Sequence, residues 1–231
     1  FSHFAQGLTY AKDEFFTPAE KEWLRQHPIL RAGVDPAWGP VEFIKDGVYE
    51  GMGADYMHLL EQRLGIKMQV ISGISWPEVL EKAKSKELDV LPLPAKTPDR
   101  EAYLNFTQVI VSLPTVIITR ADRNNIKSFD DLPARKVSVA KAYAVHEWLK
   151  ENYPRITLVP YGDVEQSLEA VAFGVVDAYV GDLASATYTI NRLGLVNLKV
   201  AGNTPYTFLL CMGIRKDWPE LVPILNKAIS A

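Results

Sequence analysis

The stretch VIVSLPTVIITR, residues 109–120, divides the chain into two halves. It is apolar and rich in β-branched residues, which favours extended backbone, but it holds a proline in its middle and is too long for one ordinary strand. A second extended apolar stretch, YTFLLCMGI, covers residues 206–214. We therefore expect the chain to leave a first lobe at about residue 112, build a second lobe and return near residue 205. Two such crossings form a natural hinge.

Strand and helix patterns alternate in both halves, which is typical of a mostly parallel sheet covered by helices. Capping boxes at Thr17 and Ser75 predict two helix starts, and Gly65 predicts a helix end. Pro223 lies deep inside the last expected helix, which leaves a kink or a later start open. The expected strands span residues 29–34, 66–71, 88–93, 136–140, 156–160, 176–181 and 198–202. The expected helices run from Thr17 to about His27, over 51–65, from Ser75, over 143–153, 163–173 and 183–193, and from Trp218 with Asp217 as cap.

These patterns predict an α/β fold with two lobes, each a βαβ block, joined by two hinge strands. The first lobe is expected to comprise residues 15–112 and 206–231, and the second, inserted lobe residues 113–205, with residues 1–14 as an N-terminal tail. Ligands of open α/β sheets bind at the carboxyl ends of the strands. The gap between the lobes is therefore the expected binding site.

Composition excludes several functions. The chain has 231 residues and a formal net charge of −3, and it has no cluster of Lys and Arg that would bind nucleic acid. No apolar run approaches the roughly 18 residues that cross a bilayer, and the start has no signal-peptide pattern. The single cysteine, Cys211, lies in an apolar run and is expected to be a buried core residue.

The sequence contains no catalytic or metal-binding motif. Its four histidines are scattered without the spacing of metal ligands. It has no nucleophile elbow, no phosphate-binding loop and no dinucleotide fingerprint. We therefore expect no enzyme activity, no catalytic residue, no metal and no cofactor. The histidines are His3, His27, His58 and His146.

Two charged residues follow expected strands on the side of the predicted cleft. Arg100 follows Thr97-Pro98-Asp99 after the strand at 88–93, where its guanidinium could bind a carboxylate through two hydrogen bonds. The alternative is that Thr97 caps a short helix and Arg100 forms a surface ion pair. Asp182 follows the strand at 176–181 and could accept hydrogen bonds from an ammonium group, or it could simply cap the next helix.

Aromatic residues stand near the same strand ends. Trp38 follows the first strand, Trp76 the second, and Tyr143 the strand at 136–140. Each could form a wall of a ligand pocket at a low cost in conformational entropy. The alternative is core packing, which is strongest for Trp76 because it lies at a helix start.

At these residues the chain resembles the type 3 family of bacterial solute-binding proteins, which have the Venus-flytrap fold, and most of all the versions fused to membrane sensors. The resemblance implies that Arg100 binds a ligand carboxylate, that Asp182 binds an α-ammonium group, and that Asp35, Trp38 and Tyr143 line the cleft. The matching segments are FFTPAEKEWLRQHPILRAGVDPAWGPVEF, DVLPLPAKTPDREAYLNFT, SFDDLPARKVSVAKAYAVHEWLKENYP and EAVAFGVVDAYVGDLASATYTINRLGLVNLKVAG.

Three positions depart from the pattern of the amino-acid binders in this family. Ala95 stands where Ser or Thr is usual, five residues before the arginine. Ala142-Tyr143-Ala144 replaces a Gly-Thr-Thr turn, and Pro94 stands near a usual glycine and removes a backbone donor. Carboxylate binding through Arg100 survives these changes better than a complete clamp for an α-amino acid.

The leading hypothesis is a periplasmic sensor domain of a membrane receptor, such as a histidine kinase, that binds a small carboxylate and signals by lobe closure. It includes a tether through a transmembrane helix after the C-terminus and allows a homodimer of the full receptor. One alternative is a free-standing solute-binding protein of an amino-acid ABC transporter. Another is an enzyme that resembles the cyclohexadienyl dehydratases, which share the fold.

Overall fold

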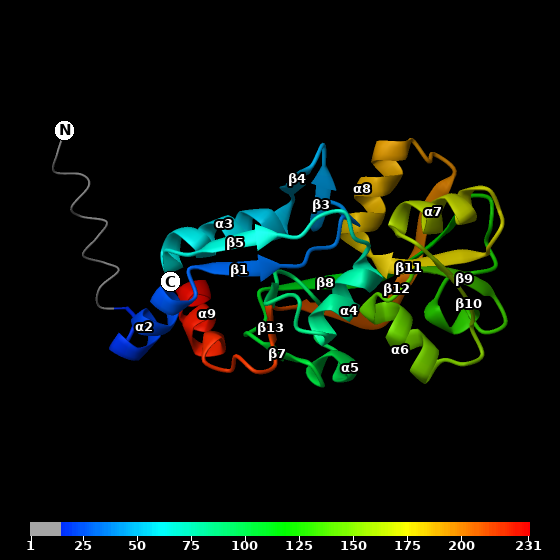
Figure 1. The fold of residues 1–231 in the computed structure, drawn as a ribbon. Coiled ribbons are helices and arrows are strands. Elements are labelled where there is room, and N and C mark those ends of the chain that lie inside the picture. Colours follow the sequence, from blue (N-terminus) through cyan, green and yellow to red (C-terminus); the bar gives the residue numbers. More distant parts are fainter. Residues whose placement is uncertain (1–14) are drawn as a thin grey trace.

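The computed structural model describes residues 15–231 as two α/β lobes side by side (Figure 1). Residues 1–14, expected to form a tail, lie outside the described part of the chain. Each lobe contains a five-stranded sheet, in the order β5-β1-β6-β13-β7 for lobe 1 and β10-β9-β11-β8-β12 for lobe 2. Within them β1 pairs in parallel with β5 and β6, and β9 pairs in parallel with β10 and β11. The predicted two-lobed α/β fold is therefore confirmed.

Local capping explains the helices of lobe 1. Thr17 and Glu20 form the predicted capping box, in which the Glu20 carboxylate accepts a hydrogen bond of 2.8 Å from the Thr17 amide. Ser75 and Glu78 do the same for the second predicted start. Gly65 ends a third helix in the left-handed conformation that glycine favours. The helices are α2 (Pro18–Gln26), α3 (Met52–Leu64), α4 (Trp76–Lys84), α5 (Pro98–Glu101) and α9 (Leu221–Ser230), and the strands are β1 (Ile29–Ala32), β5 (Lys67–Val70), β6 (Val90–Leu91), β7 (Leu104–Phe106) and β13 (Gly213–Arg215).

Lobe 2 follows the predicted order of elements. Asp163 caps its helix as expected, because its carboxylate accepts a hydrogen bond of 2.8 Å from the Gln166 amide. Asp177 accepts a hydrogen bond of 2.9 Å from the Lys136 amide and so joins two strand ends. The helices are α6 (Ala144–Asn152), α7 (Val164–Ala172), α8 (Leu183–Leu193) and the short 3-10 helix η1 (Phe129–Asp131), and the strands are β8 (Val111–Arg120), β9 (Lys136–Ala140), β10 (Thr157–Tyr161), β11 (Ala178–Asp182) and β12 (Leu198–Leu210).

The two connecting segments are longer strands than the sequence indicated. β8 runs through Pro114 without a break, so the expectation that 109–120 is too long for one strand was wrong. β12 unites the expected strand at 198–202 with the start of the expected segment at 206–214. The antiparallel pairing of β8 and β12 explains this length, because each strand continues from one lobe into the other alongside its partner.

A small antiparallel sheet at the edge of lobe 1 was not predicted. It consists of β2 (Ala37–Trp38), β3 (Glu42–Lys45) and β4 (Val48–Glu50). Asp46 and Gly47 join β3 to β4, and both have positive φ angles, of 51° and 79°. An Asp-Gly pair at a two-residue turn is a strong hairpin signal, so the sequence did contain this element. We call residues 37–50 the hairpin sheet.

The expected start of the last helix was wrong. Asp217 accepts hydrogen bonds from the Arg215 guanidinium and does not cap a helix. The helix α9 begins at Leu221, which places Pro223 in its first turn, where a missing N–H costs no hydrogen bond. The later start resolves the conflict that Pro223 created.

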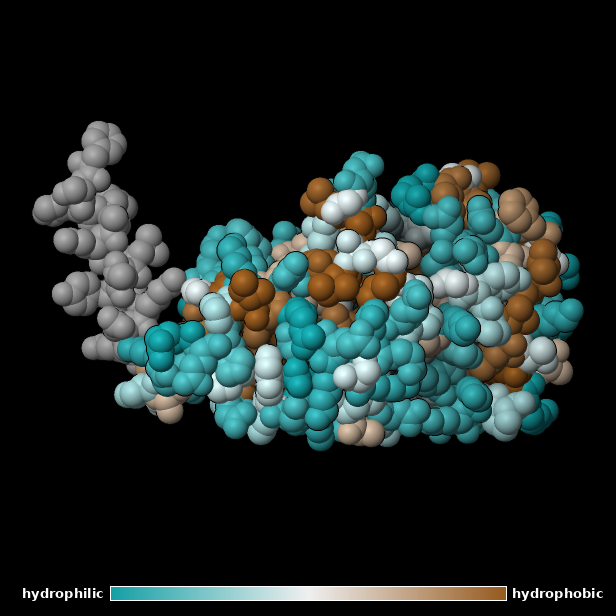
Figure 2. All heavy atoms as spheres, in the orientation of Figure 1, coloured by the Kyte–Doolittle hydropathy of each residue, from teal (hydrophilic) through white to brown (hydrophobic). Residues whose placement is uncertain are grey.

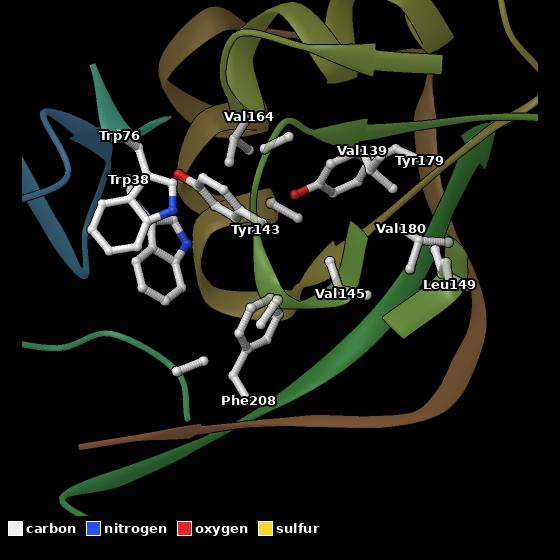
Figure 3. Close-up of a cluster of buried hydrophobic side chains, with 14 of the residues drawn as sticks. Trp38, Trp76, Val139, Tyr143, Val145, Leu149, Val164, Tyr179, Val180 and Phe208 are labelled. Atoms are coloured by element: carbon white, nitrogen blue, oxygen red, sulfur yellow. The ribbon is translucent and has the colours of Figure 1, made fainter. Parts of the chain in front are cut away.

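The buried side chains form two clusters. One lies within lobe 1, and the other extends from α4, β6 and β7 of lobe 1 across the cleft into lobe 2. The second contains Trp38, Trp76, Tyr143 and Phe208 at the boundary of the lobes, with Tyr179 deeper in lobe 2 (Figure 3). On the face shown in Figure 2, hydrophobic residues gather in separate patches over both lobes among hydrophilic ones. The hydrophobic core therefore runs across the cleft, and the lobes are packed against each other through aromatic rings.

Candidate functional site

At its centre the cleft between the lobes is closed and almost filled, whereas wider pockets of about 360 Å³ and 490 Å³ open beside the central cavity. The central cavity is about 10 Å³, which has room for about one water molecule. Side chains from both lobes surround it. The lining residues are Asp35, Trp38, Trp76, Pro94, Ala95, Arg100, Tyr143, Ala144 and Phe208.

Arg100 lies at the centre of the boundary between the lobes. It belongs to α5, which Thr97 caps by accepting a hydrogen bond from the Arg100 amide, and its side chain is 2% exposed. Its Nη1 donates to the Ala95 carbonyl of lobe 1 at 3.0 Å, and its Nη2 donates to the Ala142 carbonyl of lobe 2 at 2.8 Å. The guanidinium carbon lies 5.5 Å from the centre of the Trp76 ring. The cation therefore bridges the lobes and is not a surface ion pair.

Glu147 of α6 is the carboxylate partner of Arg100. Its Oε1 lies 3.2 Å from Arg100 Nη2, and the Glu147 side chain is 25% exposed. The contact uses one carboxylate oxygen, since Glu147 Oε2 and Arg100 Nε are buried without a hydrogen-bond partner. A guanidinium that binds a carboxylate in full does so through two parallel hydrogen bonds. The pair is therefore incomplete, and Arg100 keeps one donor free in the cleft.

Asp182 also has a partner from the opposite lobe. The Trp38 indole N–H donates to Asp182 Oδ2 at 2.8 Å, and Asp182 Oδ1 accepts from the Ser185 amide at 2.8 Å. Asp182 is thus the N-cap of α8 and also faces the cleft, so the two roles considered for it are compatible. The indole N–H occupies the position at which a ligand ammonium was expected.

Two buried carboxyl groups belong to the hairpin sheet or adjoin it: Glu42 begins β3, and Asp35 comes just before β2. Burial raises the pKa of Asp35 to about 6, against the opposing effects of the Tyr143 hydroxyl and the Ala37 amide. Burial and the charge of Asp35 raise the pKa of Glu42 to about 8. Glu42 accepts hydrogen bonds from the Asp35 amide at 3.1 Å and from the Tyr49 hydroxyl at 2.9 Å. At neutral pH the Glu42 carboxyl is therefore mostly protonated.

Aromatic side chains form the walls of the cleft (Figure 3). The Trp38 ring centre lies 5.5 Å from that of Tyr143 and 5.7 Å from that of Phe208. Trp76 donates its indole N–H to the Ala142 carbonyl at 3.1 Å and so also joins the lobes. The Tyr143 hydroxyl is buried near Asp35 but lacks a partner in hydrogen-bonding geometry. Trp38, Trp76 and Tyr143 therefore pack in the hydrophobic core and also line the cavity, so the two alternatives that the sequence left open are compatible.

All eight residues expected at the site lie in or beside the cleft. Six of them line the cavity. The other two contact lining residues: Thr97 accepts a hydrogen bond from the Arg100 amide, and Asp182 accepts one from the Trp38 indole N–H. Their role in ligand binding stays a prediction. Glu147 and Phe208 were not predicted. No local pattern marks them, because Glu147 lies on an amphipathic helix and Phe208 in a long strand. The six that line the cavity are Asp35, Trp38, Trp76, Ala95, Arg100 and Tyr143.

Other kinds of site find no support in the described residues. Within residues 15–231, no group of three or more His, Cys, Asp and Glu side chains could hold a metal ion. No helix in that range is long and apolar enough to cross a bilayer. Cys211 is buried, as expected.

The fold and the cleft define the class of protein. Residues 30–231 match the profile of the bacterial extracellular solute-binding proteins, family 3, and the chain belongs to this family. The resemblance noted in the sequence is thereby confirmed.

Individual relatives include sensors and transport proteins. The chain is 27% identical over 216 residues to the virulence sensor protein BvgS of Bordetella pertussis, and the match covers 93% of this chain but 17% of BvgS. It is 23% identical over 210 residues to the L-cystine-binding protein TcyJ of Escherichia coli K12, covering 90% of this chain and 78% of TcyJ. The crystal structure of the BvgS periplasmic VFT2 domain superimposes with a TM-score of 0.84 at 27% identity, covering 94% of this chain and 93% of that one. Its relatives are thus sensor domains and solute-binding proteins.

Proposed function

We propose that this chain is an extracytoplasmic sensor domain of a membrane signalling receptor that binds a small carboxylate between its lobes. The observation that carries the proposal is Arg100, a buried guanidinium at the lobe boundary with a free Nε donor beside the cleft. Buried donors without partners are rare because each one costs free energy. A carboxylate placed against Nε and Nη2 would satisfy this donor.

An amino acid is the ligand that the site fits best among carboxylates. Asp182 lies at the same boundary. It accepts a hydrogen bond from an N–H group of the opposite lobe, as it would from the ammonium group of a ligand. The name of TcyJ, an L-cystine-binding protein, supports this class. Ala95 and Ala144 lack the hydroxyl groups that are usual at these positions in amino-acid binders, so the contacts to Arg100 and Asp182 carry most of the recognition.

The receptor assignment rests on the relatives. BvgS is named a sensor protein, and the chain spans 17% of its length, as one module of a larger protein does. We propose a periplasmic location, a tether through a transmembrane helix after the C-terminus, and a homodimer of the full receptor. The signal is a change in the spacing of the lobes, because the ligand and the lobes compete for the same side chains. The sequence led us to expect closure on the ligand; closure and opening are the two directions that this change could take, and the spin-label distances described below distinguish them.

A free-standing binding protein of an amino-acid ABC transporter is the second candidate. It is favoured by the match to TcyJ, of which the chain covers 78%. Both candidates use the same cleft, and they differ in the segment expected beyond residue 231 of the full polypeptide. A membrane-bound kinase module there supports the receptor, and secretion of the free domain supports the transporter. We place no catalytic residue in the cleft.

A thermal-shift screen of amino acids and organic acids tests the proposal. A ligand at 100 times its dissociation constant adds about 2.7 kcal/mol to the free energy of unfolding and raises Tm. Arg100→Ala should abolish this shift, whereas Arg123→Ala, at an exposed position, should preserve it. Asp182→Asn keeps an acceptor for the Ser185 amide but loses its charge. Loss of binding in this variant indicates an ammonium group on the ligand, and full binding by Arg100→Ala would refute the site.

A further inference from the structure

The two ligand-binding side chains of the proposed site are already occupied by groups of the protein itself. Arg100 of lobe 1 holds the carboxylate of Glu147 from lobe 2, at 3.2 Å. Asp182 of lobe 2 holds the indole N–H of Trp38 from lobe 1, at 2.8 Å. A ligand with a carboxylate and an ammonium group would need these same two positions. The cleft therefore contains an internal carboxylate and an internal N–H donor in place of those of a ligand.

In the closed form the central cavity leaves no room for a ligand, and the wider pocket of about 490 Å³ beside it is lined by Arg100 and Glu147 but not by Asp182. The cavity of about 10 Å³ is smaller than any amino acid, since it has room for about one water molecule. Outside the cavity, the hairpin sheet packs against α8, where the Phe43 and Tyr188 ring centres lie 6.2 Å apart. Gly39 approaches the same ring so closely that an added Cβ would lie 2.7 Å from Tyr188 Cε1. Binding therefore requires the lobes to separate and these contacts to change.

We propose that Glu147 is an internal competitor of the ligand for Arg100, and that Glu147 and Trp38 together hold the lobes closed when no ligand is bound. This inference rests on the proposed carboxylate site and adds its regulation. The carboxylate of a ligand replaces Glu147, and its ammonium group replaces the Trp38 N–H. Bound ligand then stabilises a form in which the lobes are further apart, which is the reverse of closure on a ligand.

The incomplete pairing makes this exchange feasible. Glu147 Oε2 and Arg100 Nε are both buried without partners in the closed form. When a ligand carboxylate takes two donors of Arg100, Nε gains a partner, and Glu147, which is already 25% exposed, can turn into water. A ligand shifts an equilibrium only through its different affinity for the two forms. The extra hydrogen bond in the more open form supplies that difference.

Distances between spin labels in ligand-free protein test the proposal. Cys211→Ser removes the single native thiol, and labels at Val48 of the hairpin sheet and Val196 of lobe 2 occupy positions that are 58% and 93% exposed. Double electron–electron resonance should give one dominant short distance for the otherwise unchanged chain. Glu147→Ala and Trp38→Phe should each raise the ratio of long to short distances about tenfold, as expected for the loss of one hydrogen bond of this kind.

Matched variants make the result specific. Glu151→Ala changes the same residue type one turn later on α6, at an exposed position, and Trp148→Phe changes another tryptophan of that helix. Both should leave the distances unchanged. Sodium acetate, compared with sodium chloride at equal ionic strength, should lengthen the distance in the unchanged chain and not in Arg100→Ala.

Two results would overturn the proposal. One is a long distance that dominates in the ligand-free, otherwise unchanged chain, and the other is a distribution in Glu147→Ala and Trp38→Phe that equals that of their matched variants. These measurements need no identified ligand. They therefore separate a failure of the internal competitor from a failure of the carboxylate site, which the thermal-shift screen decides.

Discussion

Two ion pairs of this chain, each with one buried member, differ in how completely their hydrogen bonds are formed. At Asp89, Oδ2 accepts from the Arg31 amide and Nε, and Oδ1 accepts from Arg31 Nη2 and Arg215 Nη1, all within lobe 1. Arg100 and Glu147 share one contact across the lobes and leave Nε and Oε2 without partners. A saturated pair within one lobe stabilises that lobe, whereas an incomplete pair between lobes is suited to exchanging partners.

The largest expected effect is at the saturated pair. Although burial opposes it, hydrogen bonds from Arg31 and Arg215 lower the pKa of Asp89. Asp89→Asn removes the carboxylate that Arg31 binds and one of the two that Arg215 binds, and it breaks several hydrogen bonds to a charged acceptor, so it should reduce the free energy of unfolding by about 3–4 kcal/mol. Glu147→Gln should reduce it by less than about 1 kcal/mol, because that pair is partly exposed and incomplete. Urea unfolding measures both, and equal losses would contradict the comparison.

A second prediction extends the comparison to carboxyl groups without a cation. The pKa of Glu42 rises from 4.5 to about 8 through burial and the Asp35 charge, so the folded state keeps a proton that the unfolded state releases. This stabilisation is complete below about pH 4.5 and is lost as the pH rises to about 8. Glu42→Gln should remove about 3 kcal/mol of the decline in stability between pH 5 and pH 8, at about 1.4 kcal/mol per pKa unit.

The measurement for Glu42 is urea unfolding of both proteins over that pH range. Carboxylates with lowered pKa values contribute the opposite slope, but they are unchanged by the substitution and cancel in the difference between the two proteins. Parallel stability curves for Glu42→Gln and the unchanged chain would show that Glu42 does not bind the proton.

The smallest expected effect concerns the contact of the hairpin sheet with α8. Gly39→Ala introduces a Cβ at 2.7 Å from the Tyr188 ring, a clash of about 1–2 kcal/mol that exists only when the lobes are closed. The chain can relieve it by opening, so the spin-label distance should lengthen while the urea midpoint changes little. Tyr188→Ala in the same chain should restore the short distance, and a lengthened distance that persists would point to a local effect at residue 39.

Local signals made much of the fold predictable from the sequence. The capping residues Thr17, Ser75 and Asp163 set helix starts through contacts within four residues, which a sequence shows directly. The lengths of β8 and β12 were not predictable in this way, because each is extended by its pairing with the other. The prediction that Asp217 caps a helix failed for a different reason. Its carboxylate pairs with the Arg215 guanidinium, so it is not available to cap a helix.

The sequence predicted where the site lies, but it did not predict that the lobes are closed and that side chains of the protein fill the site. Residues that follow strand ends, such as Arg100, Asp182 and Tyr143, do meet at the lobe boundary, as the topology of parallel sheets requires. Glu147 was missed because its role depends on how close the two lobes approach. Neither spacing nor residue type records that separation, which is a property of the assembled chain alone.

The pairing of β8 with β12 has a gap with a mechanical consequence. Asn203 pairs with Val116 and Thr207 with Pro114, so residues 204–206 of β12 have no partner in the register. Flexing of β12 at this gap leaves the paired segments on both sides intact, so β8, which is unbroken there, carries the backbone resistance to rotation of the lobes, together with the side chains in the cleft. Because β13 and α9 follow β12 directly, a rotation of lobe 2 is delivered as torque to the C-terminal helix, at the outer end of lobe 1 (Figure 1).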